Sequence, residues 1–370
     1  MPDQVPTYLV PKETKRLVEA NIAACQNLRL ILARYVPGEV IYNDNYDERG
    51  RQKWQDVWLR QEVLPRFDVT KIKPLADAVY ARWRAMTAGA SAFTMRSQGR
   101  LLVGLGGKGV MEIGITLSHV TGLPYIPGSA LKGLTRAYAL FSIAAALGIP
   151  TTEVEPLAAL DTVLADAILV DPFLTKKDKM TAKEKEERIK KLQKDKVLDI
   201  VGERLKKGTS EVIPFLQGRK DTRLYNIAFG SQDNGGVCVF HDAVVADLPR
   251  SGSLFKADVM TPHFKDYYDD VNSDRPRYGK GPDDGQNPNP ILFITVAERT
   301  QFAFAVGLRR TAEKSDYQDI RDDNGQALET LSTAHTQAVK WLQKALDELG
   351  IGAKTAAGYG VFVDPKPING

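Results

Sequence analysis

Two long helical patterns limit how residues 100–363 can fold. The first opens at Pro127-Gly-Ser129, where Ser129 is a suitable N-cap because its hydroxyl can accept an unpaired amide of the first turn. The second runs from Leu328 to Leu349, and Gly350 follows it where a left-handed C-cap is expected. Strand-like runs lie before, between and after these helices, at residues 110–117, 225–230, 237–245, 291–296, 301–308 and 361–363.

This order of elements predicts an α+β fold close to a ferredoxin-like βαββαβ core. We expect residues 225–230 and 237–245 to form a hairpin, and residues 291–296 and 301–308 to pair with each other. The predicted division of the chain is a helical N-terminal region at 1–99, a core at 100–363 with a lysine-rich insertion at about 172–222 and a loop at about 252–290, and a tail at 364–370. Within the first region, residues 12–36 and a segment from about Pro74 have helical periodicity.

Composition excludes several classes of protein. The chain has 370 residues, 43% hydrophobic and 26% charged, which is typical of a globular protein and not of a disordered or collagenous one. The longest apolar run, Ala137–Ile149, is shorter than the roughly 20 residues of a membrane span, so no membrane partner is expected. The two cysteines give neither a disulfide framework nor a four-ligand zinc site, and the first residues lack a secretory signal. We therefore expect a cytoplasmic protein.

The net charge of +4 is unevenly distributed. Residues 176–207 hold 13 Lys and Arg against 7 Asp and Glu, so this segment alone carries a net +6. Such a segment is compatible with a polyanionic partner, or is simply a solvated charged helix.

Three segments have the residue types that bind phosphate. Gly104–Gly109, which includes Lys108, matches a dinucleotide-binding spacing, but a strand-like run follows it where such a site needs a helix. It is a plain glycine turn or a backbone–phosphate contact. In the predicted helix, Ser129, Lys132 and Arg136 share a face near the helix N-terminus, which suits phosphate, although a capped helix with a solvated cationic side would look the same.

The third segment is the glycine-rich loop Gly350–Gly360. Its glycines let the backbone approach a ligand, Lys354 could meet phosphate, and Tyr359 could stack on a base. The alternative is a flexible connection before the last strand.

The four histidines do not form a recognisable catalytic or metal site. His119 lies in a predicted turn, His335 lies in a helix, and His241-Asp242 matches only a fragment of a metal-binding pair. His263 belongs to an aromatic and basic segment that suits single-stranded RNA or a surface loop. No nucleophile elbow, Walker lysine or HExxH motif is present, so the sequence demands neither an enzyme nor a cofactor.

Taken together, these motifs resemble the RAMP superfamily of CRISPR-associated proteins. The resemblance rests on the segments Tyr125-Ile-Pro-Gly-Ser-Ala-Leu-Lys-Gly-Leu-Thr-Arg136, Phe229-Gly-Ser231, Phe240-His-Asp-Ala243 and Gly358-Tyr-Gly360. Residues 258–268, 288–296 and 352–360 are similar to one branch, the sixth-subunit family of the Cmr (type III-B) RNA-guided effector complexes. The resemblance covers about residues 100–363 and implies a ferredoxin-like core of the RNA-recognition type.

The resemblance also implies a function. It implies a non-catalytic backbone subunit in antiviral defence, which holds the 3′ region of a guide RNA and, through it, target RNA, beside other Cmr subunits. The residues that match the family's RNA contacts are Gly128, Ser129, Lys132, Arg136, Lys354, Gly358, Tyr359 and Gly360, and we add Lys108, His119, His263 and Thr355 as candidates. Target-cleaving relatives carry an aspartate in the turn before the first helix, whereas Ser118–Pro124 has no carboxylate. The alternatives are an endoribonuclease that processes guide precursors and a protein–protein adaptor.

Overall fold

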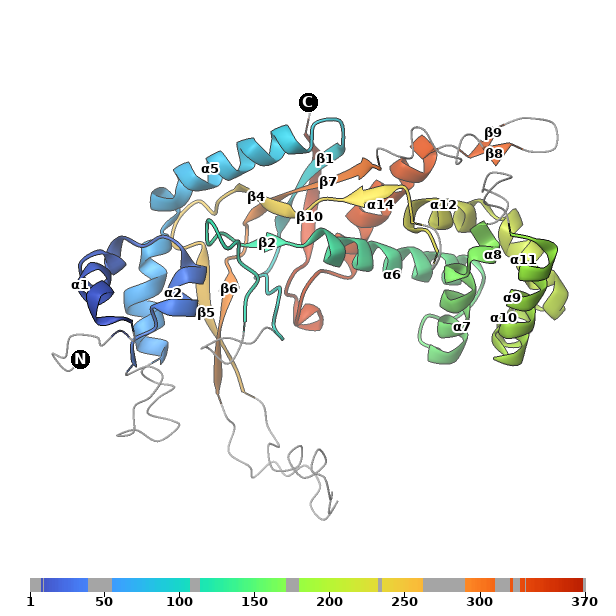
Figure 1. Ribbon diagram of the computed structural model, residues 1–370, viewed down its shortest axis with the longest axis horizontal. Helices are drawn as coiled ribbons and strands as arrows, with labels where there is room; N and C mark the ends of the chain where they lie inside the picture. Colours follow the sequence, from blue (N-terminus) through green and yellow to red (C-terminus); the bar gives the residue numbers. More distant parts are fainter. Residues whose placement is uncertain are drawn as a thin grey trace, which may run out of the picture.

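The computed structural model describes residue 8 and residues 10–38, 55–106, 114–170, 180–231, 235–261, 290–309, 320–321, 327–329 and 331–368. An antiparallel sheet lies at the centre of the molecule, with N-terminal helices at one end and a helical lobe at the other (Figure 1). The predicted α+β class is confirmed.

The central sheet joins strands from both halves of the chain. Its strands are β1 (Ser91–Ser97), β2 (Tyr125–Ile126), β3 (Cys238–Phe240), β4 (Ala243–Asp247), β7 (Gln301–Leu308) and β10 (Phe362–Pro367). Their order is β10-β1-β7-β4-β2, β3 also pairs with β7, and each pairing is antiparallel. Separate antiparallel pairs are formed by β5 (Phe255–Met260) with β6 (Ile291–Val296), and by β8 (Ile320–Arg321) with β9 (Ala327–Glu329).

Helices cover both faces of the central strand β7. Successive side chains of a strand point to opposite faces, so neighbouring residues of β7 pack against different helices. Phe302 and Phe304 pack edge-on against Phe362, in the core that α6 (Gly128–Ala146) and α14 (Leu331–Glu348) complete. Ala303 and Ala305 face the other way and contact Trp83 of α5 (Val69–Met86).

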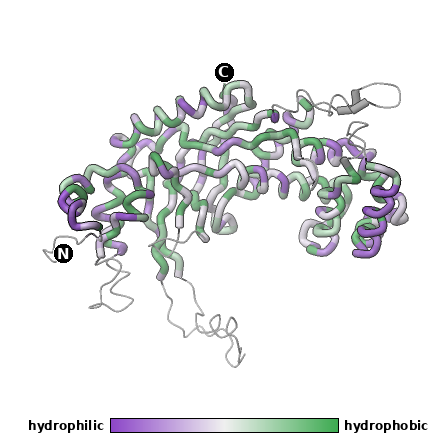
Figure 2. Tube along the Cα trace, in the orientation of Figure 1, coloured by the Kyte–Doolittle hydropathy of each residue, from purple (hydrophilic) through white to green (hydrophobic). Residues whose placement is uncertain are grey.

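The remaining helices form the two ends of the molecule. The N-terminal end contains α1 (Lys12–Asn21), η1 (Ile22–Ala24), α2 (Leu28–Arg34), η2 (Trp58–Val63) and η3 (Leu64–Phe67). The lobe contains α7 (Val154–Ala165), α8 (Ala167–Val170), α9 (Ala182–Lys194), α10 (Val197–Leu205), α11 (Thr209–Gly218) and α12 (Lys220–Phe229). In the lysine-rich segment, α9 starts with a capping box between Thr181 and Glu184 and is mostly hydrophilic (Figure 2).

Several predicted elements differ in the structure. The prediction of a strand at residues 225–230 is wrong, because residues 225–229 belong to α12 and Gly230 is its C-cap. Phe229 of this helix stacks between Phe240 and Trp341. A short apolar run does not distinguish a buried strand from a buried helix. The strands at 291–296 and 301–308 exist but do not pair with each other, since β6 pairs with β5 and β7 lies in the central sheet.

The predicted boundaries shift as well. The first strand of the sheet is β1, which lies inside the region 1–99 that was expected to be helical; of the predicted strand 110–117, residues 110–113 lie outside the described part and residues 114–117 form no strand. The expected helix 12–36 is divided into α1 and α2 by η1. Strand β5 lies within the loop expected at 252–290, and β10 runs to Pro367, into the expected tail.

Candidate nucleic-acid interface

The N-terminus of α6 is capped by a residue distant in sequence. The helix begins at Gly128, so the expectation that Ser129 is the N-cap is wrong, and no neighbouring side chain caps the first turn. Instead, the Gly128 N–H donates to Asp242 Oδ1 over 2.7 Å. A side chain at position 128 would be excluded, because its Cβ would lie 2.1 Å from the Phe240 carbonyl oxygen. The negative charge that favours a helix N-terminus is therefore supplied from within the protein.

The two predicted cations of α6 have different environments. Arg136 forms an ion pair with Asp161, with Nη2 and Oδ1 2.7 Å apart, and its guanidinium lies 5.7 Å from the centre of the Tyr225 ring. Lys132 is half-buried, and Ser129 is exposed one turn before it. Burial raises the pKa of the Cys238 thiol to about 12, and the charge of Lys132 opposes this rise. Helix α6 contacts β3, the strand that carries Cys238. Arg136 has the same intermediate burial as Lys132, so Ser129 is the most exposed of these three side chains.

The glycine-rich loop is tightly held to the segment before it. Gly360 N–H donates to the Arg100 carbonyl and Ala353 N–H to the Leu102 carbonyl, both over 2.8 Å. A Cβ at Gly360 would lie 1.9 Å from the Ile351 carbonyl oxygen, and φ at Gly360 is +68°. Within the loop, Thr355 starts the short helix η5 (Thr355–Ala357), and Gly358 ends it in the left-handed region. These contacts hold the loop against residues 100–102.

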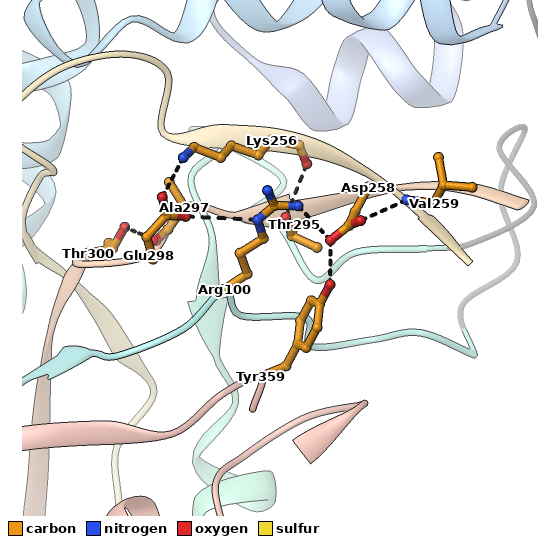
Figure 3. A network of polar contacts seen from close by, with 9 residues as sticks. All are labelled: Arg100, Lys256, Asp258, Val259, Thr295, Ala297, Glu298, Thr300 and Tyr359. Carbon is orange, nitrogen blue, oxygen red and sulfur yellow. Dashed lines mark hydrogen bonds and ion pairs between the residues drawn. The ribbon is translucent and has the colours of Figure 1, made fainter. Parts of the chain in front are cut away.

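Lys354 and Tyr359 both make contacts within the protein. Lys354 has left-handed backbone geometry with φ +62°, and its ammonium lies 4.9 Å from the centre of the buried Phe293 ring. The Tyr359 hydroxyl donates to Asp258 Oδ2, which also accepts from Arg100 Nη1 at 2.5 Å (Figure 3). Tyr359 therefore joins β5 to the loop.

This polar network continues along the β5–β6 pair. Glu298 Oε1 lies 2.5 Å from Lys256 Nζ, and its Oε2 lies 3.9 Å from Arg100 Nε (Figure 3). Burial alone would raise the pKa of Asp258, but the hydrogen bonds from Tyr359, Val259 and Arg100 lower it overall. The hydrogen bond from Lys256 holds the pKa of Glu298 below its usual value as well. Burial and the bond to Asp258 raise the pKa of Tyr359 to about 12.

The histidines have separate surroundings. His119 is exposed in the turn before β2, where Arg29 Nη2 lies 3.2 Å from its Nε2. His335 contacts the Val306 carbonyl oxygen over 2.7 Å, and burial lowers the pKa of His241. Lys108 and His263 lie outside the described residues. Within the described part, no three His, Cys, Asp or Glu side chains gather as a metal site would require.

The structure thus brings the predicted residues together in two clusters. Gly128, Ser129, Lys132 and Arg136 lie on α6, whereas Lys354, Thr355, Gly358, Tyr359 and Gly360 lie on a loop fixed to residues 99–102 and to β5 and β6. Sequence reasoning missed the contacts that hold both clusters, which are made by Asp242, Arg100 and Asp258. No spacing signal links them to their partners, since the Arg100–Asp258 and Gly128–Asp242 contacts span more than a hundred positions. None of the described helices is long and apolar enough to cross a membrane.

Comparison with known families identifies the class of protein. The family model of the RAMP superfamily matches residues 94–363, from the middle of β1 to β10. The chain belongs to the RAMP superfamily, as its motifs predicted.

A curated relative makes the resemblance more specific. Over 271 residues the chain is 32% identical to the CRISPR system Cmr subunit Cmr6 of Pyrococcus furiosus. The alignment covers 73% of this chain and 66% of that protein, so the chain matches just under two thirds of the relative's length. The predicted resemblance to the sixth-subunit family is confirmed.

Solved structures of the same group are also similar. The crystal structure of Cmr6 from Pyrococcus furiosus shares 24% sequence identity, with a TM-score of 0.33 and coverage of 74% of this chain and 97% of that one. A chain of the cryo-EM structure of the type III-B Cmr-beta complex bound to cognate target RNA shares 15% identity, with a TM-score of 0.45 and coverage of 89% and 79%.

Proposed function

We propose that this chain is a non-catalytic, RNA-binding backbone subunit of a type III-B CRISPR effector complex in the cytoplasm. It would hold the 3′ region of the guide RNA through phosphate contacts, beside other Cmr subunits, and meet target RNA through the guide. The observation that carries this proposal is the 32% identity to Cmr6, together with the RAMP match over residues 94–363.

We also propose that the core is ferredoxin-like, of the RNA-recognition type. The support is the chain order β1, α6, β4, β7, α14, β10, which is that of a βαββαβ unit, and the wholly antiparallel sheet in which the first strand lies between the last and the third. In this arrangement α6 and α14 lie side by side, and the Tyr138 hydroxyl donates to Glu348 over 3.0 Å.

Lys132 and Lys354 are the residues best placed for RNA phosphates. Lys132 is half-buried next to exposed Ser129, and Lys354 is held over Phe293 with part of its surface exposed. Arg136 could add a phosphate contact only by sharing its guanidinium with Asp161. Contacts of this kind fix an RNA backbone without reading its sequence.

The test is the affinity of the full-length chain for two unrelated single-stranded RNAs, measured by fluorescence anisotropy over a range of salt concentrations. Phosphate contacts release counterions, so affinity should fall steeply with salt. The slope should decrease by about 0.7 for each phosphate that is no longer neutralised in Lys132→Gln or Lys354→Gln. Both RNAs should lose affinity equally. The control is Lys366→Gln, which removes an exposed lysine of β10.

Three results would contradict the proposal. Unchanged affinity in both lysine variants would favour a protein–protein adaptor. A loss confined to one RNA would exclude backbone recognition. If the chain cleaves the RNA, and this cleavage is lost in a His119→Ala variant, the result would favour the endoribonuclease.

A further inference from the structure

A cavity of about 470 Å³ lies between the N-terminal helices and one edge of the central sheet. It is lined by residues of α2, α5, the turn before β2, and strands β2 and β4. Arg29 and Arg82 contribute from α2 and α5, which precede the part of the chain matched by the RAMP family model. The cavity is thus made jointly by the family core and by the N-terminal region.

Two arginines give this cavity a cationic wall. Arg29 donates from Nη1 to the Leu117 carbonyl over 3.4 Å and from Nη2 to His119 Nε2 over 3.2 Å, and its Nε is buried without a hydrogen-bond partner among the described residues. Arg82 is exposed on the same side of α5 as the cavity. A guanidinium carries five donors, so Arg82 and the two terminal nitrogens of Arg29 have more donors than Leu117 and His119 use.

The carboxylate that lines the cavity, Asp242, already has a hydrogen-bond partner. Asp242 Oδ1 accepts the Gly128 N–H, and the positive N-terminus of α6 offsets its charge. An anion entering the cavity would therefore face the two arginines and His119, and the charge of Asp242 would repel it less than a carboxylate without a partner would.

The other walls are apolar and aromatic. Val79, Leu123, Pro124 and Val244 line the cavity beside the half-buried Tyr125, and Val120 lies at its edge with 87% of its surface exposed. A cavity of this volume is within the range of small-molecule sites, which combine apolar walls with a few polar groups. A planar base fits the apolar part, and a phosphate fits the arginines.

We propose that this cavity takes one unpaired nucleotide of a bound RNA strand, with its base against Tyr125 and the apolar walls and its phosphate on Arg29 and Arg82. The inference rests on the proposed RNA-binding function and adds a second point of contact to it. A simple anion site would need only the arginines, and an apolar docking site would need only the other walls. A nucleotide uses both.

The first measurement concerns the base. The full-length chain is irradiated with a ten-nucleotide oligouridine that contains one 4-thiouridine, and cross-linked residues are identified by mass spectrometry. The proposal expects cross-links within residues 117–125. It also expects that Val79→Phe, which puts a ring into the cavity, removes these cross-links while others remain.

The second measurement concerns the phosphate. Arg82→Gln should weaken RNA binding about fivefold to tenfold and lower the salt slope by about 0.7, because one charge-assisted hydrogen bond to phosphate is removed. The matched control is Arg84→Gln, two positions along α5, which lines a different cavity and should change neither value.

The outcomes separate this inference from the proposed function. If RNA binds with the expected dependence on Lys132 and Lys354, but Arg82→Gln behaves like Arg84→Gln, or residues 117–125 are not cross-linked, the nucleotide site is refuted alone. If the full-length chain binds no RNA at low salt, the proposed function fails and the site fails with it.

Discussion

Substitution of Asp242 tests the most specific structural finding, that a carboxylate from the β3–β4 connection caps α6. The Asp242 side chain accepts the Gly128 N–H over 2.7 Å, and its backbone carbonyl accepts from Trp83 Nε1 over 2.7 Å. Asp242→Ala removes the first bond and retains the second. Loss of an N-cap bond costs about 1 kcal/mol, and loss of the favourable charge at the helix N-terminus costs about 0.3–1 kcal/mol. We expect the free energy of unfolding to fall by about 1–2 kcal/mol.

Asp242→Asn separates the two contributions. The amide oxygen of asparagine can still accept the Gly128 N–H, so only the charge is lost and the expected decrease is about 0.3–1 kcal/mol. The assay is urea unfolding at neutral pH, combined with hydrogen exchange of the Gly128 amide. Asp347→Ala, which removes an exposed acid near the C-terminal end of α14, serves as the control and should not destabilise the protein.

The reasoning on Asp242 is refuted by either of two results. Equal stability of Asp242→Ala and the wild-type protein would show that the hydrogen bond contributes nothing. Equal destabilisation in Asp242→Asn and Asp242→Ala would show that the hydrogen-bond acceptor is not what matters.

Three further predictions follow from the loop and from α6. Gly360→Ala should lower the free energy of unfolding by about 2–4 kcal/mol, because its Cβ would meet the Ile351 carbonyl oxygen at 1.9 Å. Gly358→Ala should lower it by only about 1–2 kcal/mol, because φ is +84° but no atom lies within 4 Å of the added Cβ. Equal urea midpoints of the two variants would contradict this prediction. The folded state lowers the pKa of Asp258 and Glu298, so the stabilisation that these carboxylates provide is present above their unfolded pKa values and is lost as pH falls below about 4. The double variant Asp258→Asn with Glu298→Gln should therefore flatten the acid limb of a profile of stability against pH. An unchanged limb would exclude this network as its source. Arg136→Ala should lower the unfolding free energy by about 1 kcal/mol without RNA, since the ion pair with Asp161 is about one third exposed; unchanged unfolding would mean that Arg136 is held only weakly and is free for phosphate.

The elements with long, regular patterns were predicted from the sequence. Helices α6 and α14 have sustained apolar periodicity, and strand β6 is dense in β-branched residues, so local preference and burial agree. Strand β7 is a short apolar run that is buried along most of its length. The glycine-rich loop was also predicted from its glycines, and several of them adopt positive φ in the structure.

The elements that were missed depend on tertiary contacts. Residues 225–229 are fully buried from all sides, and their helical state follows from packing against Phe240 and Trp341, which lie far away in sequence. Strand pairing is likewise non-local, so β6 could not be assigned to β5 from its own residues. The site shares this limit, since the cap from Asp242 and the Arg100–Asp258–Tyr359 network are formed only when the chain folds.

The most direct test of the central claim is affinity purification of the tagged full-length chain from its native host, followed by sequencing of the bound RNA and identification of the co-purifying proteins. The account predicts discrete short guide RNAs together with several other RAMP subunits, and loss of the RNA at high salt. Recovery of the chain without RNA or partner subunits would contradict it.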